Sequence, residues 1–529
     1  MRGRKLNTAG KVVAGILLAL ILFIIAGTAY VVISKVKDQQ VGKDKNETKK
    51  EVVKEETMTT ESVAQNSATK PEEKNDTIRI TIDEWIGWKS LLDANGGLTT
   101  KPDSINAKNG IKVEYVISND ATASSNMLIK GETAAAGYTV NRYAFLNQKF
   151  KQSNVPVKMV YITNFSNGGD GIISKSSITS IESLVGNKIA IPQFSEAQTL
   201  VEWLIEASDL TEEQKKTIRS NYILVETPDD AARVFFSGEA DAAATWEPFL
   251  TQAQNTAGAR VLFSTKEATN LILDGLVFRE DLLKENKAQI SKLIDGALEA
   301  ADKYMTDFKA IREMPLFAEE TEESIISMAN GAKLTSWKQN MSLLTDEAIT
   351  MFSDMSSIWL SIGEKANPND AQTAFDTSCI EALKEKYEEV AAEEVVVFTE
   401  DEKKVAQEKP NTEALLSKSL TVNFGGDSAV IQADSYKPLN EFAQIAKNLN
   451  GIYIQIEGNT ADVGGGPESG KNLSYERAKA IALYLEAQGI DENRFIIIGN
   501  GASNPVASND TEDGRIQNRR TDIFFKSGQ

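Results

Sequence analysis

The 529-residue sequence has no histidine and a single cysteine, Cys379. The absence of histidine excludes imidazole catalysis and histidine-bound metals, and one thiol can form neither an internal disulfide nor a thiolate metal cluster. Nucleophilic Ser/His and Cys/His systems are excluded for the same reason. We therefore expect a protein that binds without catalysing a reaction, with no cofactor and no metal. Cys379 falls in a helix-like stretch, where we expect a buried, unreactive thiol.

Basic residues are the smaller charged class. The chain has 57 Lys and Arg against 76 Asp and Glu, which gives a net charge of −19. Binding to nucleic acid without sequence preference requires a basic face that neutralises phosphates. The charge balance therefore argues against nucleic acid as a partner.

One long hydrophobic run stands near the start of the chain. Residues 12–33 contain no charged side chain over 22 positions, enough for a helix to cross a hydrocarbon core of about 30 Å. The basic residues within 1–11 favour a cytoplasmic N-terminus. A cleaved signal peptide is the alternative, but the apolar run continues beyond the weak "GTA" cleavage site. We expect a single-pass anchor in the cytoplasmic membrane, with the following domains outside, in the periplasm or cell-wall zone.

The rest of the chain divides by composition. Residues 34–77 are polar and charged and are predicted to form a disordered linker. Residues 78–387 alternate short β-rich runs with helical stretches, which is typical of an α/β domain with a largely parallel sheet. Residues 388–410 form a second acidic linker, whose "EEVVVF" stretch is able to pair with a sheet. Residues 411–529 form a further α/β domain.

The middle domain contains an internal repeat. Residues 126–139, "NMLIKGETAAAGYT", are similar to residues 233–246, "RVFFSGEADAAATW". Each copy has a helix end, a Gly-Glu turn and a strand of small residues that ends in an aromatic residue. The repeat predicts two similar lobes that face one cleft, although two alanine-rich strands can also match by chance.

Aromatic and polar side chains gather after the predicted strands of this domain. Ligands of open α/β sheets bind at the carboxyl ends of the strands, and aromatic rings there supply rigid contact area. Core packing is the alternative for any single tryptophan. The candidate ligand-binding residues are Trp85, Trp88, Tyr138, Asn164, Asp170, Trp246, Glu247 and Asp274.

Three stretches of the middle domain carry a family resemblance: "VYITNFSNGGDGIISK", "SIESLVGNKIAIP" and "DDAARVFFSGEADAAATWEPFLTQA". They resemble the solute-binding proteins of nitrate/taurine/sulfonate-type ABC importers, over residues 78–387. The resemblance implies a two-lobed periplasmic-binding-protein fold that closes on a small solute, with an ABC permease as partner and the eight candidates as ligand contacts. Family members take small anions or sulfonates, whereas the polar candidates here are mostly acidic and would repel an anion. We therefore expect a small zwitterionic or amine/sulfonate-type solute, and we hypothesise that it is zwitterionic or carries an amine.

The glycine-rich stretch "GGPESGKN", residues 465–472, is one residue short of a nucleotide-binding loop. Such a loop joins a buried strand directly to a helix and requires Ser or Thr after the lysine. Here the preceding strand ends at Gly458, and Asn472 occupies the hydroxyl position. The stretch therefore belongs to a different kind of domain.

The C-terminal domain has its own resemblance, carried by "IYIQIEGNTADVG", "LSYERAKAIALYLEAQGI" and "GRIQNRRTDIFF". It resembles the OmpA-like α/β sandwich that binds peptidoglycan, over residues 420–525. The resemblance implies that an Asp and an Arg hold the diaminopimelate of the stem peptide. Arg477 matches the family Arg, but Ala461 occupies the Asp position and the acid follows one place later. The residues that match the binding pattern or its surroundings are Asn459, Thr460, Asp462, Arg477, Asn518 and Arg519.

Together these features predict a bacterial envelope protein with a membrane helix, a solute-binding domain and a peptidoglycan-binding domain. The alternative is a ligand sensor without transport, or a structural link between membrane and wall. An enzyme is the least consistent class, because no nucleophile or imidazole system is available.

Overall fold

The computed structural model describes residues 77–529, except 270, 390–397, 426–427, 467 and 529. The predicted basic N-terminus (1–11), membrane helix (12–33) and all but the last residue of the first linker (34–77) lie outside the described residues. Residue 77 already belongs to the first strand. Within the described part of the chain, no helix is long and apolar enough to cross a membrane.

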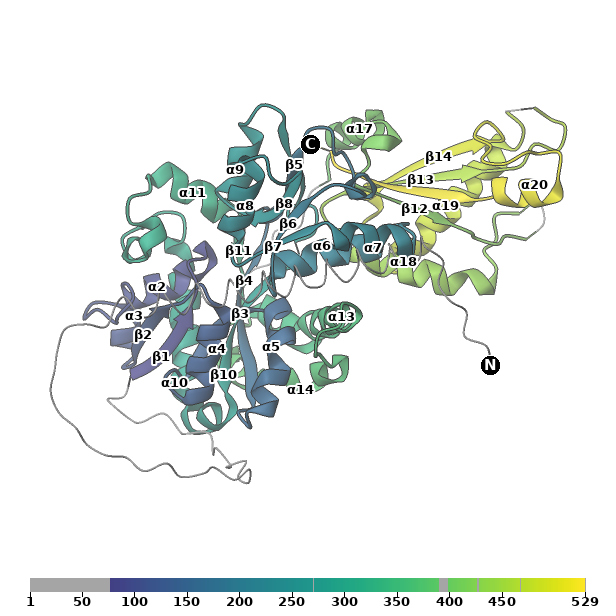
Figure 1. Cartoon of the computed structure of the whole chain (residues 1–529). Helices are drawn as coiled ribbons and strands as arrows, with labels where there is room; N and C mark the ends of the chain where they lie inside the picture. Colours follow the sequence, from purple (N-terminus) through teal and green to yellow (C-terminus); the bar gives the residue numbers. More distant parts are fainter. Residues whose placement is uncertain (1–76, 270, 390–397, 426–427, 467, 529) are drawn as a thin grey trace, which may run out of the picture. The chain divides into compact units, whose positions relative to one another are not determined.

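The first lobe of the middle domain is built on a six-stranded sheet with the order β11-β4-β10-β3-β1-β2 (Figure 1). Its strands are β1 (Thr77–Ile82), β2 (Lys112–Ile117), β3 (Ala135–Thr139), β4 (Val157–Ser166), β10 (Leu273–Arg279) and β11 (Ala332–Leu334). Its α-helices are α2 (Lys89–Asn95), α3 (Ile105–Lys108), α4 (Ala121–Lys130), α5 (Val140–Gln152), α10 (Glu280–Glu299), α11 (Glu322–Asn330), α12 (Trp337–Ser342), α13 (Ala348–Ser361), α14 (Ala371–Ala374), α15 (Ser378–Glu381) and α16 (Lys384–Tyr387).

The second lobe is built on a five-stranded sheet with the order β7-β6-β8-β5-β9. Its strands are β5 (Asp170–Lys175), β6 (Ile189–Pro192), β7 (Tyr222–Val225), β8 (Ala242–Trp246) and β9 (Ala259–Ser264). Its helices are α6 (Glu196–Ala207), α7 (Glu212–Ser220), α8 (Pro228–Phe236) and α9 (Phe249–Gln254). The chain passes between the lobes twice, from β4 to β5 and from β9 back to β10.

The predicted internal repeat is confirmed. In the first lobe β1 pairs in parallel with β2 and β3, and in the second lobe β6 pairs in parallel with β7 and β8. Helix α4 leads into β3 through Gly131, and α8 leads into β8 through Gly238. These glycines have φ values of 74° and 84°, in the left-handed region that glycine adopts without strain.

The expectation of a largely parallel sheet is wrong for both lobes. Strand β10 runs antiparallel to β3 and β4, β11 runs antiparallel to β4, and β5 runs antiparallel to β8 and β9. Alternation of strands and helices predicts parallel pairs only within each repeat unit. The strands that connect the two lobes are as apolar as the parallel strands. Their direction therefore cannot be predicted from residue composition.

The C-terminal domain has a four-stranded sheet with the order β12-β15-β13-β14. Its strands are β12 (Leu416–Leu420), β13 (Tyr453–Asn459), β14 (Phe495–Gly501) and β15 (Thr521–Lys526), and its helices are α18 (Tyr436–Asn448), α19 (Lys471–Ala487) and α20 (Glu512–Asn518). The stretch 388–410 is not wholly a linker, because it contains helix α17 (Glu400–Glu408). A capping box between Thr399 and Glu402 begins that helix.

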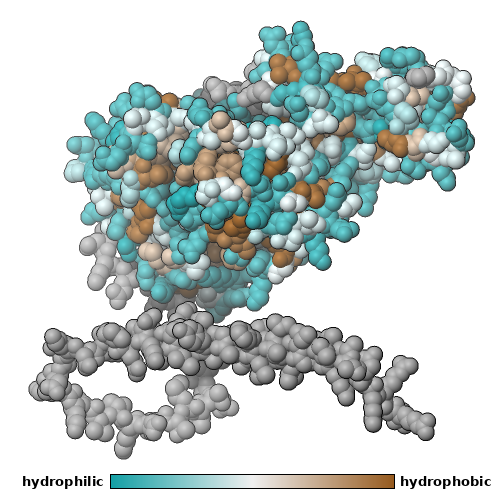
Figure 2. All heavy atoms as spheres, turned by 45° about the horizontal axis from the view of Figure 1, so that its top comes forward, coloured by the Kyte–Doolittle hydropathy of each residue, from teal (hydrophilic) through white to brown (hydrophobic). Residues whose placement is uncertain are grey.

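Burial follows the layered architecture. Apolar side chains of both lobes and of the C-terminal sheet form the core, and Cys379 is buried in it as predicted. Hydrophilic side chains predominate on the face drawn in Figure 2, with small apolar clusters between them. This face is thus mostly polar, consistent with an acidic chain.

Candidate functional site

Strand ends from both lobes meet where the chain passes between them. Asp83 follows β1 directly, and Asp274 at the start of β10 lies opposite Thr139 and Asn164 in the sheet. Asp274 reaches this edge because β10 is antiparallel, so that its first residues lie beside the carboxyl end of β3. In the other lobe, Asp170 at the start of β5 lies opposite Trp246 at the end of β8.

Two indole rings join the lobes. Trp85 of the first lobe stacks on Trp246 of the second, with ring centroids 6.4 Å apart and planes 10° from parallel. The Trp85 Nε1 donates a hydrogen bond of 3.1 Å to Asn164 Oδ1, which fixes the ring. A Cβ at Gly169 would lie 2.3 Å from the Trp85 ring, so only glycine allows the chain to pass there.

A cross-lobe ion pair lies beside these rings. The Arg142 guanidinium, in the first turn of α5, is 2.9 Å from the Glu196 carboxylate at the start of α6. It is also 3.5 Å from the carboxylate of Asp83. Arg142 Nε and Glu196 Oε2 nevertheless have no hydrogen bond in the described structure, so the pair is close in distance but not ideal in geometry.

Two carboxylates are buried in the same region. Asp170 and Asp274 are each 4% exposed. Among the described residues, Asp274 Oδ2 has no hydrogen-bond partner. Burial raises the pKa of Asp274 well above its usual range, and the nearby Asp83 and Asp170 raise it further, while Arg142 opposes them. Burial also raises the pKa of Asp170 to about 7, with Glu196 adding to the shift.

We call Asp83, Arg142, Asp170, Glu196 and Asp274 the inter-lobe cluster. Asp170 and Asp274 were predicted from the sequence as candidate ligand-binding residues, whereas the other three were not. All three missed residues lie just after strands β1, β3 and β6, so the rule that selected Trp85 and Tyr138 would have found them. Burial raises the pKa of Asp83, and Arg142 opposes that shift.

Three other candidates have their polar atoms occupied by neighbours. Trp88 is fully buried, and its Nε1 donates to Asp83 Oδ1 at 2.7 Å. The Tyr138 hydroxyl lies 2.9 Å from Ser124 Oγ. The Glu247 carboxylate accepts hydrogen bonds from the backbone N–H and the hydroxyl of Thr251 at 3.1 and 2.9 Å, in the first turn of α9. These side chains support the strand ends in the described state.

Further contacts hold the lobes together in this state. Asn141 Nδ2 donates to Thr199 Oγ1 at 2.9 Å, and the rings of Phe145 and Phe194 stack at 4.8 Å. Thr265 Oγ1, on one connection between the lobes, lies 2.7 Å from Ser166 Oγ on the other. The two lobes are therefore closed on each other around the inter-lobe cluster.

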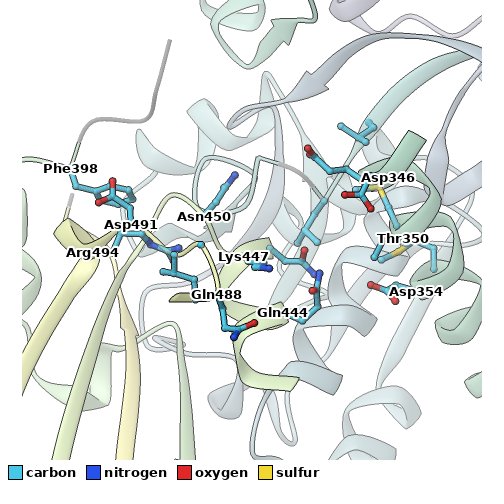
Figure 3. Close-up of a pocket in the computed structure, with 18 residues that line it drawn as sticks. Asp346, Thr350, Asp354, Phe398, Gln444, Lys447, Asn450, Gln488, Asp491 and Arg494 are labelled. Carbon is cyan, nitrogen blue, oxygen red and sulfur yellow. The ribbon is translucent and has the colours of Figure 1, made fainter. Parts of the chain in front are cut away.

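A separate hollow of about 660 Å³ is drawn in Figure 3. Asp354, Lys447 and Arg494 are among the side chains that line it. None of the candidate ligand residues lies on its wall. It is therefore distinct from the inter-lobe cluster.

In the C-terminal domain, strand β13 ends at Asn459. Asn459 Nδ2 donates to Asp522 Oδ2 at 3.1 Å, and Thr460 Oγ1 donates to the Ser469 carbonyl at 3.3 Å. Asp462 Oδ1 accepts the backbone N–H groups of residues 464, 465 and 466 at 2.8, 2.9 and 3.1 Å. These hydrogen bonds lower the pKa of Asp462. The glycine stretch is thus a turn organised by an acid rather than a phosphate cradle.

Arg477 projects from α19 over an aromatic ring. Its guanidinium carbon is 5.0 Å from the Phe424 ring centroid, and its Nε donates to the Ser428 carbonyl at 3.0 Å. Buried Asn518 donates to Asn509 Oδ1 at 2.8 Å, and the same Oδ1 accepts the Asp462 backbone N–H at 3.1 Å.

Arg519 differs from these residues in forming an ion pair. Its guanidinium lies 2.6 Å from the Glu512 carboxylate. Asn518 thus links two loops, whereas Arg519 is held by a carboxylate of α20.

Two family models match the chain. The model described as "NMT1/THI5 like" matches residues 107–309, and the model described as "OmpA family" matches residues 423–519. Outer membrane protein A of Bordetella avium is 34% identical over 123 residues, which cover 22% of this chain and 63% of that protein. Peptidoglycan-binding protein ArfA of Mycobacterium tuberculosis is 38% identical over 104 residues, which cover 19% of this chain and 31% of that protein.

The chain thus spans less than two thirds of the length of these relatives. Among solved structures, the periplasmic aliphatic sulphonate binding protein SsuA from Escherichia coli gives a TM-score of 0.45 at 15% identity. That comparison covers 57% of this chain and 98% of SsuA. Both resemblances in the sequence are confirmed by these matches, since residues 107–309 are similar to the NMT1/THI5-like family and residues 423–519 to the OmpA family.

Proposed function

We propose that this protein is an extracytoplasmic solute-binding protein of an ABC-type importer, anchored in the cytoplasmic membrane and tethered to peptidoglycan by its C-terminal domain. The observation that carries the proposal is the inter-lobe cluster, where Arg142 of one lobe contacts Glu196 of the other. Contacts of this kind form only when the lobes close, and hinge closure around a ligand is a standard signal of occupancy. The closed form would be the one that an ABC permease recognises.

The solute is a small molecule that carries an amine. Four carboxylates and one guanidinium in the inter-lobe cluster support this choice, because a simple anion would be repelled by the net negative charge. The indole rings of Trp85 and Trp246 contribute contact area and attract a cation. Asn164, Glu247, Trp88 and Tyr138 hold the strand ends in position.

The C-terminal domain binds the stem peptide of peptidoglycan. Arg477 would pair with a carboxylate of the peptide, because a guanidinium binds carboxylates in a planar, two-pronged geometry. Asn459, Thr460, Asn518 and Arg519 shape the surrounding loops. Asp462 contributes through the turn it organises, since Ala461 occupies the position of the family carboxylate.

The test is a thermal-shift series on the purified full chain with amines, zwitterionic amino acids, sulfonates and nitrate. We expect an amine-bearing compound to raise the melting temperature and to be recovered chemically unchanged. If no compound of any charge shifts the melting temperature, the solute-binding proposal is wrong. Recovery of a chemically converted compound would instead indicate that the protein is an enzyme.

A second candidate is a ligand sensor or a structural link that works without transport. The OmpA-family domain favours it, because attachment to the wall restrains movement toward a permease. Co-purification of the full chain with a permease would support transport. Ligand binding without any permease partner would support the sensor.

A further inference from the structure

The carboxylate of Asp274 is an unusual feature of the inter-lobe cluster. Its side chain is 4% exposed, and its Oδ2 has no hydrogen-bond partner among the described residues. A buried polar atom without a partner loses its hydration and gains nothing in return. Since Asp274 begins strand β10 opposite Thr139 and Asn164, it lies at the same strand edge as Asp83.

The surroundings of Asp274 are acidic. The charges of Asp83, Asp170 and Glu196 all act on it, and only the Arg142 guanidinium in this cluster opposes them. If every group in the cluster were ionised, four negative charges would face one positive charge. The inter-lobe cluster therefore contains more acidic than basic side chains, and an added cation would balance its charge.

Arg142 is already engaged. It lies 3.5 Å from Asp83 and 2.9 Å from Glu196, so both of its neighbours are carboxylates. A solute carboxylate or sulfonate would have to displace one of these and would then face the remaining acids. A cation that binds Asp274 Oδ2 displaces no hydrogen-bond partner, because this atom has none among the described residues.

We propose that the solute is an organic cation, an amine or amidine without a carboxylate or sulfonate, whose charged nitrogen is bound by Asp274. Asp170 is the second carboxylate that this nitrogen approaches, and the Trp85 and Trp246 rings contact the carbon framework. Glu196 holds Arg142 and excludes anionic groups. The proposal rests on the proposed solute-binding function and narrows its ligand class.

The experiment is isothermal titration of the full chain with probes that share a framework and differ only in charge. The first set is benzylamine, benzyl alcohol, phenylglycine and phenylmethanesulfonate, and the second is butylamine, butanol, norvaline and butanesulfonate. We expect an amine to bind in at least one set, about tenfold or more tighter than its neutral, zwitterionic and anionic counterparts. Tighter binding of a zwitterion or sulfonate overturns the cation proposal but leaves solute binding intact. Absence of heat with every probe counts against both.

Two variants locate the cation. Asp274→Asn should weaken amine binding about tenfold or more while raising the melting temperature of the unliganded protein, because it removes a buried carboxyl group whose Oδ2 has no hydrogen-bond partner among the described residues. The exposed Asp302→Asn is the matched control and should change neither. A merely structural Asp274 would not produce this opposite pair of effects.

The second variant, Glu196→Gln, leaves Asp274 in place and removes the nearer of the two carboxylates beside Arg142. It should improve phenylglycine or norvaline binding by about tenfold relative to the amine. Unchanged amine binding by Asp274→Asn, or unchanged selectivity in Glu196→Gln, overturns the assignment.

Discussion

At the scale of single residues, the first lobe contains a fully buried ion pair that takes no part in the inter-lobe cluster. Lys89 Nζ lies 2.6 Å from Asp93 Oδ2, one turn later in α2, and donates to the Lys303 carbonyl at 3.1 Å. The two side chains are 0% and 2% exposed. The rings of Tyr304 and Phe308 lie 5.7 and 5.3 Å from the ammonium. Desolvation of both charges is offset by these contacts only while both partners are present.

Lys89→Met should therefore lower the free energy of unfolding by about 3–5 kcal/mol, because it leaves the Asp93 carboxylate buried without its cation. Urea unfolding of the full chain, followed by tryptophan fluorescence, measures the change. The double variant Lys89→Met with Asp93→Leu should recover much of the loss. If the double variant is as unstable as the single one, the loss comes from packing rather than from the unpaired charge.

Asp170 makes the unliganded protein sensitive to pH. Its pKa is raised from 3.8 to about 7, by burial first and then by Glu196 and Asp83, against Arg142. The folded state therefore retains a proton that the unfolded state has released, so this group's contribution to stability falls as pH rises from about 4 to 7. Amine binding has the opposite trend, because the cation pairs with the ionised carboxylate.

The check is the melting temperature of wild type and Asp170→Asn between pH 5 and 8, within the range about the raised pKa of Asp170. The difference between the two proteins isolates Asp170 from the other acids. We expect wild type to lose stability relative to the variant as the pH rises toward 7, and the difference to level off above it. Parallel curves would show that Asp170 does not titrate in this window.

At the scale of elements, the connection from β4 to β5 is shaped by contact rather than by turn chemistry. A Cβ at Gly169 would lie 2.3 Å from the Trp85 ring and 2.6 Å from the Gly331 carbonyl oxygen. The ring could shift, but the backbone oxygen could not without moving β11. The closed arrangement of the lobes therefore requires glycine at position 169, because any Cβ there would clash.

Gly169→Ala should destabilise the closed form by about 1–3 kcal/mol, the usual cost of overpacking. Amine binding should weaken in proportion, which titration measures directly. Gly425→Ala is the control, because its nearest side-chain atom would be at an ordinary 3.5 Å. If both variants bound the amine equally well, the connection from β4 to β5 would be able to accommodate a Cβ at position 169.

At the scale of the whole molecule, the sequence predicted the repeat and the gathering of polar side chains at strand ends, because both follow from local patterns. The alanine-rich copies ending at Tyr138 and Trp246 are visible in the chain. The antiparallel entry of β10 is not, and it is this reversal that brings Asp274 beside Thr139. The pairing of Arg142 with Glu196 depends on lobe closure, which no local pattern encodes.

Attachment to the wall is tested separately from solute binding. Arg477→Ala in the full chain should reduce the fraction retained on purified peptidoglycan about tenfold, because a charge-assisted pair is lost. Lys479→Ala is a matched control, since it removes a positive charge from an exposed position of the same helix. Retention of Arg477→Ala at the wild-type level would show that this arginine is not the wall contact.

In the proposed function, a small cation closes the two lobes around the inter-lobe cluster. The most direct test of this closure is the distance between spin labels on the two lobes, at Lys130→Cys and Lys188→Cys in a Cys379→Ser background, with and without benzylamine or butylamine. We expect the distance distribution to narrow to the closed distance when an amine is added and to stay unchanged with the matching sulfonate. A distribution that is the same with every probe, or that closes only with the sulfonate, would contradict it.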